Sequence, residues 1–119
     1  MFSPEVLDHF EHPRNAGELR SATAVVRVTN PVCGDVLQLF VRVESGRVAE
    51  ARFKARGCVT SMACSSLLTE LASGKTRAEL SQITPEQISD ALGGLPPATF
   101  HGAQLACDAL AAIVGTLQS

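Results

Sequence analysis

Two stretches of alternating residues, 36–43 and 47–55, constrain the fold more than any other part of this sequence. Alternation with a period of two is typical of strands that bury one face, because successive side chains point to opposite sides. Ser45 and Gly46 stand between the stretches and predict a tight turn. The expected inward-facing residues are Leu37, Leu39, Val41 and Val43 in the first stretch and Ala49, Ala51 and Phe53 in the second.

A third stretch rich in β-branched residues, ATAVVRVTN at 22–30, precedes this hairpin. Asn30, Pro31 and Gly34 break the chain after it, so the simplest arrangement of the three strands is an antiparallel meander. Apolar residues elsewhere predict helices, in the segments 4–12, 60–74, 75–83, 84–92 and 101–117. We therefore expect an α+β fold: a three-stranded antiparallel β-sheet with helices packed on one face, in a single domain over residues 1–119.

Charge and composition argue against several classes of function. The net charge is −2 and no basic run is present, which gives no electrostatic support for binding nucleic acid. No apolar run approaches the roughly 20 residues of a membrane span. The first residues lack the apolar core of a secretory signal. We therefore expect a cytoplasmic protein with neither nucleic acid nor membrane as a partner.

The expected meander brings distant residues together. In such a sheet, the turn at 30–35 lies at the same end as the exit of the third strand. Cys33 and Asp35 belong to that turn, and Cys58 directly follows that exit. His101 stands at the start of the last helix, after a stiff Leu-Pro-Pro segment. We expect these four side chains to converge at one end of the sheet.

Two thiols, a carboxylate and an imidazole form a set that can bind metal. Such a set suits zinc, and thiolates also hold iron–sulfur clusters. A structural interpretation competes with this one: a cysteine also serves as a small buried residue, and an aspartate in a turn often bonds its own backbone. A third interpretation is an enzyme with Cys33 or Cys58 as nucleophile and His101 as base. The chain shows no nucleophile elbow or oxyanion motif that would favour it.

Five motifs in order resemble the NifU/IscU-type iron–sulfur cluster assembly scaffolds. They are LDHFEHPRNAG, NPVCGD, ARFKARGC, SSLLTELASGK and LPPATFHG, and together they span nearly the whole chain. The resemblance implies a three-stranded antiparallel sheet with helices on one face, in agreement with the strand pattern. No extra insertion precedes the LPP segment, so the chain is more similar to the IscU-like branch than to the zinc-containing SufU-like branch.

The resemblance implies a scaffold rather than an enzyme. Such proteins accept sulfur from a cysteine desulfurase and iron from a donor, build a labile [2Fe-2S] cluster and pass it to apo-proteins. Carried over by position, Cys33 and Cys58 would be thiolate ligands and sulfur acceptors. Asp35 would be a weak oxygen ligand or a labilising group, and His101 would be the alternative ligand at the last corner.

The sequence departs from the family pattern at two positions. Gly102 stands where the resemblance expects a third cysteine, and Thr99 stands where it expects a lysine that an Hsp70 chaperone recognises. These departures put full sulfur-acceptor chemistry and handover through the chaperone in question. A second hypothesis is therefore a divergent paralogue that binds zinc or a mononuclear metal at the same four residues, in sulfur relay or regulation.

The remaining cysteines and histidines are expected to be structural. Cys107 follows Gly102 by five residues, which is roughly 140° around a helix, so the two do not share a face. We expect Cys107 to be half-buried and keep it only as an additional ligand candidate. Cys64 is expected in the core of its helix. His9 and His12 are spaced to bind a metal, but a solvated helix face is the favoured interpretation.

Overall fold

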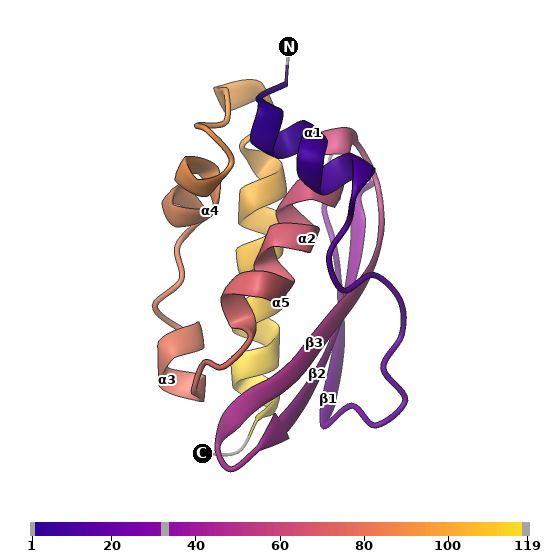
Figure 1. Cartoon of the computed structure of the whole chain (residues 1–119), viewed down its shortest axis with the longest axis vertical. Coiled ribbons are helices and arrows are strands. Elements are labelled where there is room, and N and C mark those ends of the chain that lie inside the picture. The colour runs from indigo at the N-terminus through magenta and orange to yellow at the C-terminus, as the bar shows by residue number, and fades with distance from the viewer. Residues whose placement is uncertain (1, 32–33, 118–119) are drawn as a thin grey trace.

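The computed structural model describes residues 2–31 and 34–117. Its three strands form one antiparallel sheet in the order β1-β2-β3, which confirms the expected meander (Figure 1). The elements along the chain are α1 (Pro4–Glu11), β1 (Ala24–Thr29), β2 (Val36–Glu44), β3 (Arg47–Arg56), α2 (Val59–Ala72), α3 (Arg77–Leu80), α4 (Pro85–Ala91), the 3₁₀ helix η1 (Pro97–Thr99) and α5 (His101–Thr116).

The helices form a layer on one face of the sheet, as expected (Figure 1). Helix α2 packs against β3, α1 and α5, and α5 packs against β1 and β2. The core between the layers includes Leu37, Leu39 and Phe53 from the sheet, which are almost completely buried. Burial of each such side chain stabilises the fold by about 1.5–3 kcal/mol relative to its exposure. This packing fixes the helices that carry the candidate site.

One expected inward-facing residue points the other way. The pairing of β2 with β3 shifts register at Arg42/Val43, where a β-bulge leaves Ala49 without a partner. Val48 is consequently buried and Ala49 is exposed. The expectation that Ala49 shares a face with Ala51 was therefore wrong, because the extra residue of a bulge reverses the alternation.

Helix α2 lies in the middle of the helical layer and is buried on several sides. Its buried residues include hydroxyl side chains as well as apolar ones, among them Ser61, Ser65, Ser66 and Thr69. Among the described residues, no buried side-chain nitrogen or oxygen lacks a hydrogen-bond partner. Ser61, Ser66 and Thr69 bond residues outside α2, whereas Ser65 bonds the Ser61 carbonyl of the same helix.

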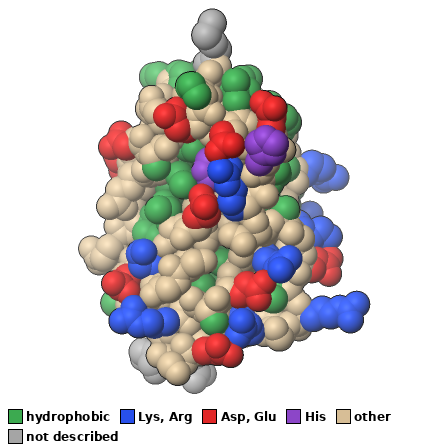
Figure 2. Space-filling view, in the orientation of Figure 1, with side chains coloured by type: hydrophobic (Ala, Val, Ile, Leu, Met, Phe, Trp, Pro, Cys, Tyr) green, Lys and Arg blue, Asp and Glu red, His purple; other side chains and the backbone are tan. Residues whose placement is uncertain are grey.

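The surface facing the viewer mixes charges of both signs over the helical layer, and hydrophobic side chains gather at the end where α1 lies (Figure 2). Large apolar side chains that are exposed on and beside α1 are Phe2, Leu7 and Phe10. In the described part of the chain, no helix combines the length and apolar character that crossing a membrane requires.

Candidate metal centre

The turn before β2 places Asp35 beside the exit of β3. The backbone N–H of Asn30 donates to the Asp35 carbonyl at 2.8 Å, which closes the turn. Val36 pairs with Arg56, so Asp35 lies next to Gly57. A Cβ on Gly57 would sit 2.6 Å from Asp35 Oδ1, so only glycine lets the carboxylate approach this closely. Asp35 is buried here, at 5 % exposure.

Cys58 is the N-cap residue of α2. Its Sγ accepts a hydrogen bond from the backbone N–H of Ser61 at 3.4 Å, which satisfies one of the free donors of the first helical turn. Cys58 is exposed to solvent, so its sulfur is accessible to an incoming partner.

His101 completes a group of three potential metal ligands. It is the first residue of α5, and its Nε2 lies 3.4 Å from Asp35 Oδ2 and 3.8 Å from Cys58 Sγ. One donor atom from each of Asp35, Cys58 and His101 lies within 4.8 Å of the others, and no other such group was found in the part of the chain that the structure describes. Ligand atoms around a tetrahedral ion with bonds of about 2.0–2.3 Å are about 3.3–3.8 Å apart. The arrangement therefore fits one metal with small adjustments.

The expected convergence thus holds for Asp35, Cys58 and His101, which lie in the turn before β2, at the N-cap of α2 and at the start of α5. Cys33 lies outside the described residues, and its part in the site stays a prediction.

Gly102 allows α5 to approach α2 at the site. A Cβ at this position would lie 3.2 Å from Ser61 Cα and 3.3 Å from Cys64 Sγ. Such distances are shorter than ordinary packing contacts, and the Ser61 backbone has little room to move. A cysteine in place of Gly102 would therefore push α5 away from α2.

The other two described thiols lie apart from the three-residue group. Cys64 is completely buried, and burial raises the pKa of its thiol to about 12. Cys107 is half-buried, and burial raises the pKa of its thiol to about 11. Its Sγ donates to the Ile83 carbonyl at 3.7 Å, toward the loop before α4. Both thiols stay protonated at neutral pH, and among the described residues the structure gives Cys107 no hydrogen bond to Asp35, Cys58 or His101.

Ser61 is a site residue that the sequence analysis missed. Its hydroxyl donates to Asp35 Oδ2 at 2.6 Å, and the Cys58 thiol lies 3.4 Å from the same hydroxyl. Ser61 is 2 % exposed. The signal available in the sequence was its position three residues after Cys58, in the first turn of the helix, where side chains lie beside the cap.

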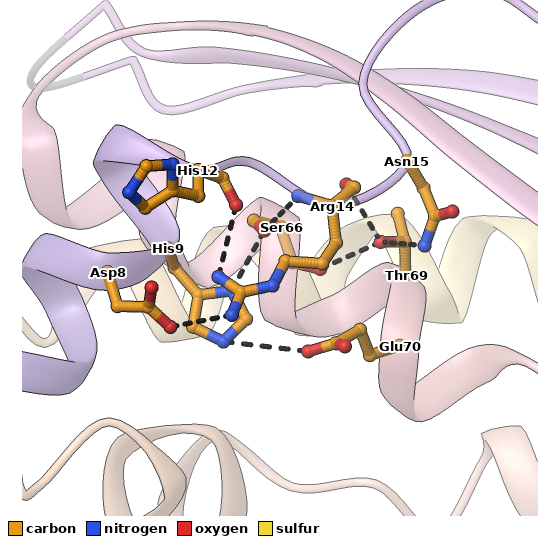
Figure 3. Close-up of polar contacts among 8 residues, drawn as sticks. All are labelled: Asp8, His9, His12, Arg14, Asn15, Ser66, Thr69 and Glu70. Atoms are coloured by element: carbon orange, nitrogen blue, oxygen red, sulfur yellow. Dashed lines mark hydrogen bonds and ion pairs between the residues drawn. The ribbon is translucent and has the colours of Figure 1, made fainter.

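A second polar group lies where α1 and the residues after it meet α2 (Figure 3). We call it the His9 cluster, and it consists of His9, Arg14, Ser66, Thr69 and Glu70. Ser66 Oγ accepts from the Arg14 backbone N–H and lies 2.8 Å from His9 Nδ1, each contact holding the N-terminal segment to α2. The other ring nitrogen, Nε2, faces Glu70 Oε1 at 3.5 Å. His9 is 8 % exposed. The expectation of a solvated face was therefore wrong for His9, while His12 is exposed.

Comparisons with known proteins identify a family and relatives that match most of this chain. The family model described as the NifU-like N terminal domain matches residues 1–119. The iron–sulfur cluster assembly scaffold protein IscU 1 of Archaeoglobus fulgidus is 44% identical over 110 residues, which are 92% of this chain and 72% of that protein. IscU of Haemophilus influenzae is 41% identical over 117 residues, covering 95% of this chain and 92% of that protein.

Solved structures share the fold. A candidate iron–sulfur cluster assembly scaffold for the SUF system from Fervidobacterium islandicum superposes with a TM-score of 0.77 at 20% sequence identity. The superposition covers 93% of this chain and 94% of that one. At this identity the likeness concerns the architecture alone, and it matches the sheet and the helical layer described above.

Proposed function

We propose that this chain, which belongs to the family of NifU-like N-terminal domains, is a scaffold on which a labile [2Fe-2S] cluster is assembled for transfer to apo-proteins. Relatives more than 40% identical over most of the chain are named as iron–sulfur cluster assembly scaffolds, which supports this function. The whole of residues 1–119 acts as one domain in this proposal. The chain carries the cluster as cargo and does not itself catalyse a reaction.

The observation that carries the proposal is the meeting of Asp35, Cys58 and His101 at one end of the sheet. With Cys33, they offer iron two thiolates, one carboxylate and one imidazole. Thiolates are the usual ligands of iron–sulfur clusters, and replacing some of them changes the properties of the cluster. Mixed ligands on an open edge of the protein favour a cluster that can leave.

The proposed partners are a cysteine desulfurase, which supplies sulfur, and apo-proteins, which receive the cluster. The exposure of Cys58 supports sulfur delivery from outside, since the buried Cys64 offers no such access. An Hsp70-type chaperone is not included among the partners. Thr99 lies in η1 at the position where the resemblance expects the lysine of a chaperone motif.

A second candidate function is binding of zinc or another single metal ion by the same four residues. The close packing at Gly102 favours it, because a side chain at this position would press against the Ser61 backbone and glycine supplies no third thiol there. Two sulfur, one nitrogen and one oxygen ligand suit zinc. Such a protein would act in sulfur relay or regulation.

Anaerobic reconstitution distinguishes the two candidates. The apo-protein is incubated with ferrous iron, cysteine and a cysteine desulfurase, with and without an equal amount of zinc. Visible absorption, iron and acid-labile sulfide are then measured on the desalted protein. The scaffold function predicts that the desalted protein retains iron and acid-labile sulfide in equal amounts, even when zinc is present. Bound zinc without sulfide under both conditions would favour the second candidate.

Cys58→Ala and Cys64→Ala are the matched variants for this experiment. Both remove a thiol from the region of α2, but only Cys58 belongs to the three-residue group. We expect the cluster to be lost from Cys58→Ala and retained by Cys64→Ala. The reverse result would place the site elsewhere.

A further inference from the structure

We propose that Ser61 is the positioning residue of this site and that it orients Asp35 for metal binding through its hydroxyl group. This inference rests on the proposed metal site and adds a residue that neither the sequence pattern nor the relatives' names assign.

The first contact fixes the carboxylate. Ser61 Oγ donates to Asp35 Oδ2 at 2.6 Å, a short distance typical of a hydrogen bond to a charged oxygen. A carboxylate oxygen has two lone pairs, so this bond leaves the second free. The same oxygen lies 3.4 Å from His101 Nε2, on the side of the candidate ligands. Ser61 thus takes one lone pair of Oδ2 and leaves the other for a metal.

The second contact fixes the thiol. The Ser61 backbone N–H donates to Cys58 Sγ at 3.4 Å, and the thiol lies at the same distance from the Ser61 hydroxyl. One residue therefore touches candidate ligands from two separate elements, the turn before β2 and the start of α2. Since these elements meet only at the end of the sheet, Ser61 sets the distance between their ligand atoms.

The third contact concerns α5. The missing side chain of Gly102 lets this helix reach the Ser61 backbone, where a Cβ would lie 3.2 Å from Ser61 Cα. The neighbouring residue His101 is thereby brought to the site. Gly57 limits the carboxylate from the opposite side, because the space its Cβ would occupy is filled by Asp35 Oδ1. Asp35 Oδ1 thus lies against Gly57, and Asp35 Oδ2 accepts the hydrogen bond from Ser61.

Removing such a partner weakens metal binding because the ligand must then be ordered by the metal itself. Hydrogen-bond partners of metal ligands typically change affinity by about 10–100-fold when they are mutated. Ser61 carries no charge and does not reach the metal in this proposal, so its effect passes through Asp35. We expect Ser61→Ala to weaken metal binding about tenfold.

The experiment uses cobalt(II) as the metal, titrated anaerobically into the intact apo-protein with a competing chelator. Cobalt reports its ligands through visible ligand-field bands and a thiolate charge-transfer band. Ser65→Ala is the matched control, since Ser65 is equally buried on the same helix and its hydroxyl bonds the Ser61 carbonyl, at 2.9 Å. Thermal unfolding of each apo-protein accompanies the titration.

The test of the mechanism is a double-mutant cycle with Asp35→Ala. If Ser61 acts through Asp35, the tenfold effect of Ser61→Ala disappears in the Asp35→Ala background, and the ligand-field bands of the two single variants shift alike. An equal loss in both backgrounds would overturn the inference. So would cobalt affinity in Ser61→Ala that equals that of Ser65→Ala.

A second pair of variants protects the test against misfolding. Ser61→Thr keeps the hydroxyl and Ser61→Val replaces it by a methyl group of the same shape. We expect the threonine variant to bind cobalt more tightly than the valine variant by about tenfold, and equal affinities would contradict the role of the hydroxyl. If the unaltered protein bound no cobalt at all, the proposed metal site itself would be wrong, whereas binding without a Ser61 effect would overturn only the inference.

Discussion

The candidate metal centre and the His9 cluster are built from the same types of residue. Each has a buried serine of α2 at its centre, a histidine from another helix and a carboxylate. In the metal centre these are Ser61, His101 and Asp35, and in the His9 cluster they are Ser66, His9 and Glu70 (Figure 3). Only the first contains a thiol, that of Cys58, and the ligand atoms of Asp35, Cys58 and His101 lie within 4.8 Å of one another.

The difference lies in what the hydrogen bonds leave unused. In the His9 cluster, Ser66 Oγ accepts from the Arg14 backbone while it contacts His9, and both ring nitrogens of His9 face partners. These contacts are made within the protein, so the cluster fastens the N-terminal segment to α2. In the metal centre, the exposed Cys58 leaves one side open to a ligand. Residue types alone therefore do not distinguish a cluster that holds two segments together from a site that binds a ligand.

The largest expected effect that tests this contrast is the removal of the thiol. Cys58→Ala deletes one ligand of the metal centre and touches nothing in the His9 cluster. We expect metal affinity to fall by more than about 100-fold, since even outer partners of ligands contribute 10–100-fold. Equilibrium dialysis against zinc measures it. If the zinc affinity of Cys58→Ala stayed within a few-fold of that of the unaltered protein, the metal would not bind at the candidate centre.

Ser66→Ala is the corresponding change in the His9 cluster. It leaves His9 Nδ1 and the Arg14 backbone N–H without their shared partner. Each unsatisfied buried group costs about 1–3 kcal/mol, so we expect the free energy of unfolding in urea to fall by about 3 kcal/mol. Zinc affinity should be unchanged under folding conditions. A variant of normal stability that bound zinc poorly would reverse the assigned roles.

A smaller effect is expected where α5 touches α2. Gly102→Ala places a methyl group 3.2 Å from Ser61 Cα, and overpacking of this kind costs typically about 2 kcal/mol. Gly115→Ala is the control on the same helix, because open space surrounds its missing Cβ. Alanine there should stabilise the helix by up to about 1 kcal/mol. We expect the unfolding temperature to fall in Gly102→Ala and to rise in Gly115→Ala. A change in the same direction in both variants would count against close packing at Gly102.

The smallest expected effect is a dependence on pH. Burial lowers the pKa of His9, and Arg14 lowers it further, against the opposing influence of Glu70 and Asp8. As pH falls below the ordinary histidine value of about 6.5, the unfolded chain therefore takes up the proton before the folded one. The stability that a neutral His9 contributes is present above this value and is lost as pH falls toward the lowered pKa.

Two substitutions test the origin of this dependence. In His9→Gln the free energy of unfolding should fall less between about pH 6.5 and pH 5 than it does in the unaltered protein. His12→Gln, at an exposed residue just after the same helix, is the control for removing a histidine from this segment. Parallel slopes in His9→Gln and the unaltered protein would show that another group titrates.

The sequence predicts the sheet well because alternation is a local signal. The strands at β1, β2 and β3, their order and the helices on one face all follow from it. The bulge does not, since Val48 and Ala49 are both apolar and the pattern cannot tell which of them the sheet omits. Its position depends on how β3 pairs with β2, which is a tertiary property.

The site is predictable to the extent that topology brings its residues together. Asp35 and Cys58 meet because a meander returns β3 to the turn before β2, and His101 follows from its place before α5. Ser61 and His9 could not be assigned in this way. A serine in the first turn of a helix and a histidine on an amphipathic helix have the same sequence signal whether they are exposed or buried. Their roles depend on the packing of α2 against its neighbours.

X-ray absorption at the zinc edge of the zinc-loaded protein identifies the atoms bound to the metal. For a site formed by Cys33, Asp35, Cys58 and His101 we expect a mixed shell, with sulfur from the two cysteines at about 2.3 Å from the zinc and lighter atoms from Asp35 and His101 at about 2.0–2.1 Å. In His101→Ala the contribution of the imidazole should disappear. A shell of sulfur alone, or an unchanged spectrum in His101→Ala, would contradict the site.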